Sequence, residues 1–402
     1  MVHVAVFGYG TVGSGVVEVI ERNNSYVSAN SGDKVSVKYI LDLREFPGDP
    51  YESKLVHDVE TIINDDEVSI CCETMGGVGA AYKFTKMALE KGKSVCSSNK
   101  ELVAKHGAEL MRIAKENGCA YLFEASVGGG IPVLRTLTTA LTAERITKIA
   151  GILNGTTNFI LTRMEEDGAD FDETLKKAQE LGYAEKDPTA DIEGHDTARK
   201  ISILSDIMSG HFTDSDAVKT TGITRITSTD ITLAKEAGYS IRLLGIADRS
   251  DDDSVAAFVA PFLVKKSHPL AGVCDVFNAI YVTGNMLGET MYYGKGAGKL
   301  ATASAVVADV IDAARKGSST MYQGWDETPV KAASADDLKY KFYVRCTEEK
   351  FDDVQAQFPG GCRIGKFGGE SGFVTEDLSG AEFEARLAKL GDAVLNSIRI
   401  YE

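Results

Sequence analysis

The chain has 402 residues and a formal net charge of −16, and 44% of its residues are apolar. This length exceeds what one hydrophobic core usually organises, so we expect two or three domains. An acidic chain without a run of Lys and Arg argues against a nucleic-acid partner. The sequence offers no signal peptide and no apolar stretch of about twenty residues, which argues against a membrane role. The seven cysteines form no C-x-x-C pair, so we expect a reducing, cytoplasmic location.

The first 130 residues alternate short β-branched segments with amphipathic ones, a pattern typical of a doubly wound parallel sheet in an α/β domain. Helices are expected at Ala80–Lys91 and Glu101–Asn117, each ending near Gly or Asn. The expected strands are Val2–Phe7, Val35–Leu41, Ser69–Glu73, Ser94–Ser97 and Tyr121–Glu124.

From residue 131 to about 294 the pattern changes to apolar strands mixed with polar helices, which predicts a second, α+β domain. Its strands are expected at Ile146–Leu153, Ser254–Leu263 and Ala279–Gly284. A Gly-rich loop, Tyr292–Gly298, precedes a helix at Thr302–Ala314 that we expect to return to the first domain. The predicted division is therefore 1–130 plus about 295–316, and 131–294.

The segment Lys316–Ser334 contains Gly, Ser and Pro and is predicted to be a linker. Residues 335–402 then follow the order strand, helix, strand, strand, helix, strand. The expected elements are Lys339–Cys346, Glu348–Gln357, Cys362–Lys366, Ser371–Thr375, Ala381–Leu390 and Val394–Tyr401. This βαββαβ order resembles an ACT-type regulatory module. We expect the module to be dispensable for any chemistry in the preceding domains.

A G-x-G-x-x-G motif, Gly8 to Gly13, follows the first predicted strand directly and opens a helix. Gly8 permits a tight turn, Gly10 lets the backbone approach a pyrophosphate, and Gly13 allows close helix–sheet packing. With Thr11 and Val12, these residues place helix N–H groups toward an anion. The first domain is thus predicted to be a Rossmann-type dinucleotide-binding domain, although a plain strand-to-helix turn is the alternative.

Asp42 lies at the end of the second strand, where a carboxylate accepts hydrogen bonds from the adenosine ribose and favours NAD. Arg44 lies close enough to contact a 2′-phosphate instead, and an ordinary strand-end turn is an equal alternative. Thr74, Ser98 and Lys100 follow two later strands at the edge where such sheets bind ligands. For an isolated lysine, a solvated position is the more common explanation.

In the second domain, Asn154–Asn158 follows a strand and offers amides and hydroxyls to a polar ligand, or simply caps a helix. Gly182–Asp196 is dense in carboxylates and precedes a helix in which Asp196 and Lys200 stand one turn apart. A surface ion pair is the simpler interpretation of that pair. A calcium loop is disfavoured because the EF-hand ligand order is absent.

Taken together, these segments resemble the homoserine dehydrogenase family from about residue 4 to 314. The motifs occur in the family's order, and residues 151–200 are the most specific part. The matching motifs are Gly8–Gly13, Ser98–Leu102, Phe123–Pro132, Gly151–Asn158, Gly182–Lys200 and the late Gly-rich loop. The resemblance implies an NAD(P)-dependent oxidoreductase that interconverts L-homoserine and L-aspartate 4-semialdehyde in threonine and methionine biosynthesis.

The resemblance also assigns roles to individual positions. Lys100 and Lys200 match the family's two active-site lysines, and Asp191 and Asp196 match acids that orient them or hold substrate. The homoserine pocket is matched by Gly155, Thr156, Tyr183 and Glu185, together with Asp191 and Lys200. The cofactor set is Gly8, Gly10, Thr11, Val12, Gly13, Asp42, Thr74, Ser98, Lys100 and Gly296. A monovalent-cation site for Na⁺ or K⁺, built largely from carbonyls, is matched by Glu124, Val127, Gly129 and Ile131. Family members are usually homodimers or homotetramers joined through the second domain.

Two departures from the family pattern bear on function. Leu41 stands where many members have an Arg, which weakens the case for NADP. Ala301 precedes Thr302 where a Pro is usual, which bears on how the late loop closes over the nicotinamide.

Two competing functions are weighed against this one. A semialdehyde dehydrogenase would need an activated thiolate, but cysteines such as Cys71 and Cys72 lie in apolar segments. A non-catalytic dinucleotide or amino-acid sensor would not require both lysines with the Glu185–Asp196 acids. The chemistry itself requires a proton acceptor for the alcohol, and a lysine in a closed, partly desolvated site serves as one.

Overall fold

The computed structural model describes residues 1–249, 254–316 and 324–402. The chain forms two compact units, and each is described by itself. Unit 1 comprises residues 1–145, 202–215 and 294–330, and unit 2 comprises residues 146–201, 216–293 and 331–402. In the described ranges, no helix is both long and apolar enough to cross a membrane.

Unit 1 is built on a six-stranded parallel sheet with the order β3-β2-β1-β4-β5-β6. The strands are β1 Val2–Phe7, β2 Val35–Leu41, β3 Leu55–Val56, β4 Val68–Glu73, β5 Ser94–Ser97 and β6 Tyr121–Leu122. The central strand β1 buries Val4 to Phe7 completely, because helices cover both faces of such a sheet. The predicted doubly wound sheet is confirmed, although the strand expected at 121–124 ends at Leu122 and continues as a 3₁₀ turn.

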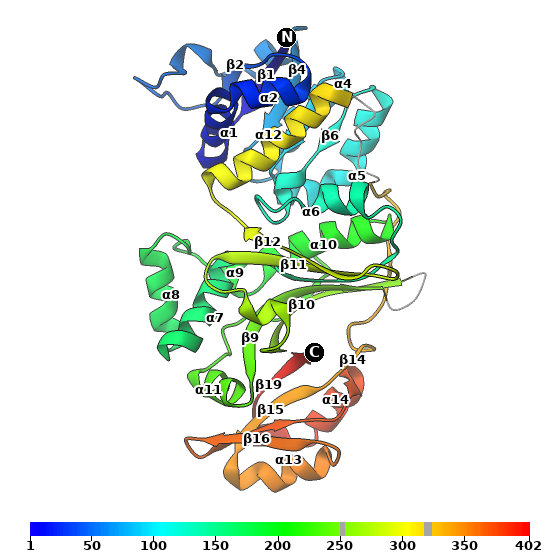
Figure 1. The fold of residues 1–402 in the computed structure, drawn as a ribbon. Helices are drawn as coiled ribbons and strands as arrows, with labels where there is room; N and C mark the ends of the chain where they lie inside the picture. Colours follow the sequence, from blue (N-terminus) through cyan, green and yellow to red (C-terminus); the bar gives the residue numbers. More distant parts are fainter. Residues whose placement is uncertain (250–253, 317–323) are drawn as a thin grey trace. The chain divides into compact units, whose positions relative to one another are not determined.

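Among the described residues of unit 1 there are seven α-helices that lie wholly within it, and α12 comes from late in the sequence to pack beside α1 and α2 (Figure 1). Their bounds are α1 Thr11–Arg22, α2 Asn24–Ser31, α3 Val59–Ile63, α4 Gly79–Glu90, α5 Lys100–Glu116, α6 Val133–Arg135 and α12 Lys299–Lys316. A Cβ on Gly15 of α1 would lie 2.8 Å from the Lys299 carbonyl oxygen, so the two helices approach closely. Helix α12 therefore belongs to unit 1.

Unit 2 contains most of an eleven-stranded mixed sheet. Along its main path the order is β12-β11-β7-β9-β10-β19-β15-β17-β16, with β8 and β13 pairing with β10. The strands are β7 Ile146–Ile152, β8 Lys219–Thr220, β9 Tyr239–Asp248, β10 Ser254–Lys265, β11 Phe277–Gly284, β12 Gly288–Lys295, β13 Lys331–Ala332, β15 Phe342–Thr347, β16 Cys362–Phe367, β17 Glu370–Val374 and β19 Val394–Tyr401. A two-stranded sheet pairs β14 Lys339–Tyr340 with β18 Leu378–Ser379.

The helices that lie in unit 2 or begin in it are mostly short and polar on one side. They are α7 Gly155–Asp167, α8 Phe171–Glu180, α9 Thr189–Ile192, α10 His195–Ser209, α11 Ser228–Glu236, α13 Phe351–Gln357 and α14 Gly380–Leu387. On one face of the large sheet, α10 lies so close that a Cβ on Gly245 would meet Thr197 and Ile201 at about 3 Å.

The structure corrects two sequence-based expectations in this half. The long strand β9 was not predicted, although it is buried along its length. The segment Tyr292–Lys295, expected within a Gly-rich loop, belongs to the edge strand β12. Backbone pairing with β11 decides this conformation, and the local glycines do not reveal that pairing. Gly296–Gly298 alone remains as the loop before α12.

The last 68 or so residues contain the predicted βαββαβ order, yet they do not form a separate packing unit. Strand β19 pairs in parallel with β10, from Phe262↔Arg399 to Val264↔Tyr401. One buried core joins residues of β7, β9 and β10 to those of β15, β17 and α14. Residues 317–323 of the expected linker lie outside the described residues, and Trp325 beyond them is buried against Phe123. That the module is an ACT domain with a ligand of its own stays a prediction.

Candidate active site

The turn between β1 and α1 has the geometry that a dinucleotide requires. Gly8 has a φ of +89°, which favours glycine, and a Cβ on Gly13 would lie 1.9 Å from the Gly8 carbonyl oxygen. Gly10 precedes the first turn of α1, and a Cβ there would meet nothing within 4 Å. Thr11 and Val12 begin the helix, so their N–H groups belong to its unsatisfied first turn. The backbone around Gly10 is therefore open to a phosphate at a helix N-terminus.

Thr74 supports this turn from behind. Its Oγ1 donates within 2.9 Å of both the Phe7 and the Gly8 carbonyl oxygens, and it would lie 2.8 Å from a Cβ on Gly13. The Thr74 hydroxyl is thus engaged in hydrogen bonds within the protein. A contact between Thr74 and the cofactor stays a prediction.

Asp42, at the end of β2, is held in a dense set of hydrogen bonds. Its Oδ2 accepts from the Tyr9 N–H at 2.8 Å, and its two oxygens accept from the Arg44 guanidinium at 2.9 Å each. Hydrogen bonding to Arg44 holds the pKa of this carboxyl well below its usual range. Arg44 itself is largely exposed, so an anionic and a cationic side chain lie together where the adenosine ribose is expected.

The ends of β4 and β5 place the next set of predicted residues. Ser98 follows β5, Asn99 caps α5 by accepting from the Leu102 N–H at 3.1 Å, and Lys100 is the first residue of that helix. The sequence analysis did not select Asn99, although a polar residue just before a helix signals a cap. It also did not select Glu73, the last residue of β4.

The residues predicted to hold a monovalent cation lie where β6 leads into α6. The Glu124 carboxylate is buried and accepts from the Leu134 and Arg135 N–H groups at 3.0 and 2.7 Å. Gly129 approaches the late loop so closely that a Cβ would lie 2.5 Å from the Gly296 carbonyl oxygen. Within the described ranges, no cluster of three or more His, Cys, Asp and Glu side chains is placed to hold a metal ion. The Glu124 side chain thus fixes the backbone of α6, and any cation there would rest on main-chain oxygens.

In unit 2, four polar residues converge beside the end of β7. The Lys200 ammonium, on α10, donates to Asp196 Oδ2 at 2.7 Å and to the Leu153 carbonyl oxygen at 2.7 Å. The Asn154 amide donates to Asp191 at 2.7 Å and to Asp196 at 2.9 Å. Lys200 is 9% exposed and Asp196 4% exposed, so this is a buried site and the surface-pair alternative is wrong.

The sequence indicated Asn154 only as part of a polar-ligand segment or a helix cap, and it did not connect Asn154 with the lysine and the two aspartates. Its Oδ1 caps α7 by accepting from the Thr157 N–H, while its Nδ2 bridges the two aspartates. The cap and the polar-ligand interpretations of this motif are therefore compatible. The sequence does not predict this bridge, because Asp191 and Asp196 lie 37 and 42 residues after Asn154 in the chain.

The predicted homoserine-pocket residues lie at the start of α7 and in the loop after α8. Thr156 Oγ1 donates to the Tyr183 carbonyl oxygen at 2.7 Å, and the Tyr183 ring packs edge-on against Phe159. A Cβ on Gly155 would lie 2.9 Å from the Val276 carbonyl oxygen, so the helix start lies close against the chain before β11. Glu185 is exposed, and its main-chain oxygen accepts from Gln179. Lys100 belongs to unit 1 and Lys200 to unit 2, so their convergence stays a prediction.

The cysteines do not supply a thiolate nucleophile in the sheet of unit 1. Burial raises the pKa of Cys71 to about 12 and that of Cys119 to about 11, and it raises those of Cys72 and Cys96 well above their usual range. A neutral, buried thiol is a poor nucleophile. These four residues therefore argue against the thiol-dependent semialdehyde dehydrogenase.

The parallel sheet, the glycine turn at its switch point and the buried lysine–carboxylate site define a nicotinamide-dependent oxidoreductase. The family model "Homoserine dehydrogenase, NAD binding domain" matches residues 8–124, and the model "Homoserine dehydrogenase" matches residues 132–311. The chain belongs to the homoserine dehydrogenase family.

Individual relatives agree with this assignment. The homoserine dehydrogenase of Bacillus subtilis is 45% identical over 313 residues, covering 77% of this chain and 72% of that protein. The crystal structure of a homoserine dehydrogenase from Thiobacillus denitrificans is 34% identical, with a TM-score of 0.91 over 100% of this chain and 98% of its own. A hyperthermophilic archaeal homoserine dehydrogenase in complex with NADPH is 28% identical, with a TM-score of 0.67 over 78% of this chain and 97% of its own. The non-catalytic sensor finds no support among these relatives.

Proposed function

We propose that this chain catalyses reversible hydride transfer between L-homoserine and L-aspartate 4-semialdehyde with NAD or NADP, in threonine and methionine biosynthesis. The observation that carries the proposal is the buried contact of Lys200 with Asp196 beside the start of α7. This contact fixes the position of an amine that can exchange the hydroxyl proton of a substrate bound there. The test is a homoserine-dependent reduction of NAD or NADP by the purified chain. No reduction with either cofactor, by a protein that is folded, would refute it.

The roles of the residues follow from their contacts. In its neutral form Lys200 accepts the hydroxyl proton as homoserine is oxidised and becomes the ammonium, and Lys100 stabilises charge or exchanges the proton. Asp196 orients Lys200 directly, and Asp191 supports Asp196 through Asn154. Gly155, Thr156 and Tyr183 line the pocket. Glu185, which is exposed in this structure, pairs with the substrate ammonium. When bound, the nicotinamide cofactor would supply the hydride acceptor and donor. The turn Gly8–Gly13 would hold its pyrophosphate, and Ser98 and Gly296 would also contact the cofactor.

Cofactor preference depends on the Asp42–Arg44 pair. We expect NAD use at least comparable with NADP use, since Leu41 provides no cation and Asp42 is anionic. Arg44 offsets part of that charge, so we expect Arg44→Gln to lower kcat/KM for NADP by about tenfold and that for NAD by less, because a 2′-phosphate then meets Asp42 alone. Steady-state kinetics with both cofactors measure this. Arg22→Gln, an exposed arginine of α1, is the control. A native preference for NADP of tenfold or more would contradict the role given to Asp42.

A monovalent cation, Na⁺ or K⁺, is proposed to rest on carbonyl oxygens of Val127, Gly129 and Ile131, with Glu124 fixing the local backbone. Full activity after both ions are replaced by tetramethylammonium would contradict this site.

The chain is proposed to form a homodimer or homotetramer through unit 2. The edge strand β12 carries Met291 and Tyr293, which are 40% and 53% exposed, and an unpaired edge with apolar side chains favours association. A monomeric mass by light scattering would contradict this proposal. We place the enzyme in the cytoplasm, in keeping with its free cysteines, and cell fractionation tests that location.

A further inference from the structure

A buried carboxyl group at the end of β4 has no part in the proposed chemistry. Glu73 is 0% exposed, and its partners are uncharged. Its Oε2 accepts from the Ser97 hydroxyl at 2.6 Å, and its Oε1 accepts from the Met75 N–H at 2.8 Å. The titratable side chains on the elements around it are Tyr121 on β6, Lys100 at the start of α5, the buried Asp309 on α12, and the neutral thiols Cys72 and Cys96.

Ser97 and Asn99 extend this contact to two functional segments. Ser97 Oγ accepts from the Asn99 N–H at 3.0 Å. The Asn99 side chain donates to the Gly77 and Met75 carbonyl oxygens at 2.7 and 3.3 Å, and it also caps α5. Glu73 is therefore bonded on one side to the loop 74–78 and, through Ser97, on the other side to the helix start that carries Lys100.

These segments lie where the second half of a dinucleotide is expected. The strand order reverses between β1 and β4, which is the switch point at which such sheets bind their cofactor. The pyrophosphate turn follows β1, so the loops after β4 and β5 are left for the nicotinamide half. The loop after β4 also packs on that turn, because a Cβ on Gly8 would lie 3.0 Å from Met75 Cγ.

The charge of Glu73 changes near neutral pH. Burial raises the pKa of this carboxyl to about 7, against the opposing effect of hydrogen bonds from Ser97 and the Met75 N–H. The oxidised nicotinamide ring carries a positive charge and the reduced ring carries none. An ionised carboxyl beneath the nicotinamide half therefore stabilises the oxidised form selectively.

We propose that Glu73 is a positioning residue that ties the loop 74–78 to the start of α5, and that its ionisation makes the binding of oxidised cofactor tighten with rising pH. The proposal rests on the dinucleotide site proposed above. Below the pKa the carboxyl is neutral and only the positioning contacts remain; above it, the negative charge is added. By linkage, an oxidised cofactor that lowers the pKa of Glu73 by about one unit binds about tenfold more tightly at high pH.

The experiment measures dissociation constants of NAD and NADH by calorimetry across neutral pH, without substrate. NAD and NADH avoid the titrating 2′-phosphate of the other pair. For the native chain we expect NAD binding to tighten by about tenfold as pH rises through about 7, while NADH binding changes by less than about threefold. Glu73→Gln should remove the pH dependence of NAD binding. Glu67→Gln, an exposed carboxyl just before β4, should keep it.

Ser97→Ala keeps the carboxyl but removes a hydrogen bond that favours its charged form, so the midpoint of the NAD curve should move to higher pH. A purely structural role for Glu73 would not move that midpoint. If Glu73→Gln does not fold, as judged by circular dichroism, this shift alone decides the question. The same pH dependence in native and Glu73→Gln proteins, or an unmoved midpoint in Ser97→Ala, overturns the proposal. Failure of the native chain to bind either cofactor overturns the dinucleotide site instead.

Discussion

Replacement of Lys200 by methionine should lower kcat for homoserine oxidation by about two to four orders of magnitude, the usual contribution of a positioned acid–base group. The ammonium is held from two sides, by Asp196 and by the Leu153 carbonyl oxygen, and it is almost fully buried. Methionine has similar length and no proton to exchange. Cofactor binding, measured by calorimetry, should persist because the glycine turn belongs to the other unit.

Lys100→Met should have an effect of the same order if the second lysine also contacts the reacting groups. Asn154→Ala should lower kcat by less, because it removes the bridge between Asp191 and Asp196 and leaves the Lys200–Asp196 contact in place. Lys176→Met, on the exposed side of α8, is the control for loss of a lysine. Near-native kcat in a folded Lys200→Met protein would exclude its role and make a bound water or Glu185 the better candidate.

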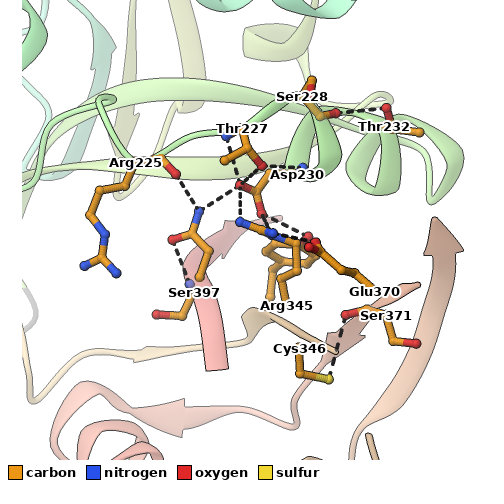
Figure 2. Close-up of polar contacts among 12 residues, drawn as sticks. Arg225, Thr227, Ser228, Asp230, Thr232, Arg345, Cys346, Glu370, Ser371 and Ser397 are labelled. Carbon is orange, nitrogen blue, oxygen red and sulfur yellow. Dashed lines mark hydrogen bonds and ion pairs between the residues drawn. The ribbon is translucent and has the colours of Figure 1, made fainter. Parts of the chain in front are cut away.

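Loss of Arg345 should destabilise unit 2 by about 3–5 kcal/mol, because it leaves a buried carboxylate without its charged partner. Asp230 is fully buried on α11, and its Oδ1 accepts from Arg345 Nε at 2.7 Å (Figure 2). Its Oδ2 closes the capping box with Thr227 and accepts from Asn396 at 2.9 Å. Arg345 and Asn396 come from β15 and β19, so this cluster fastens the C-terminal strands to α11.

Arg345→Met is therefore the variant to make, and hydrogen exchange of the α11, β15 and β19 amides is the measurement, since it reports local opening free energies. Asp230→Asn combined with Arg345→Met should recover part of the loss, because the buried charge is then absent. Lys341→Met, which breaks an exposed pair with Glu402, should cost less than about 1 kcal/mol. Unchanged exchange at these amides in Arg345→Met would refute the anchoring role.

The same variant tests whether the C-terminal strands are needed for chemistry. We expect kcat of Arg345→Met to stay within about tenfold of native at temperatures where the protein is folded, because every proposed reacting group precedes residue 335. A truncation near Ala335 does not test this independence well, because the C-terminal residues pack on the rest of unit 2. It would remove the partner strand of β10 and expose Phe262, whose ring packs against Tyr340 and Tyr401.

The sequence by itself determined the local features of this protein. The spacing of Gly8, Gly10 and Gly13 predicts the dinucleotide turn, because only glycine fits the positive φ and the 1.9 Å approach observed there. Short β-branched apolar segments and helical patterns likewise predict β1, β2, β5 and the helix α12, since these are local properties of the chain.

Only the tertiary structure decided how distant polar groups combine. Asn154 reaches Asp191 and Asp196, and Asp230 reaches Arg345, across sequence separations of 37, 42 and 115 residues. Burial of Glu73 raises its pKa, and the pairing of β19 with β10 joins the C-terminal strands to the large sheet. Desolvation and strand pairing depend on which segments meet in space, and no local pattern of residue types specifies that meeting.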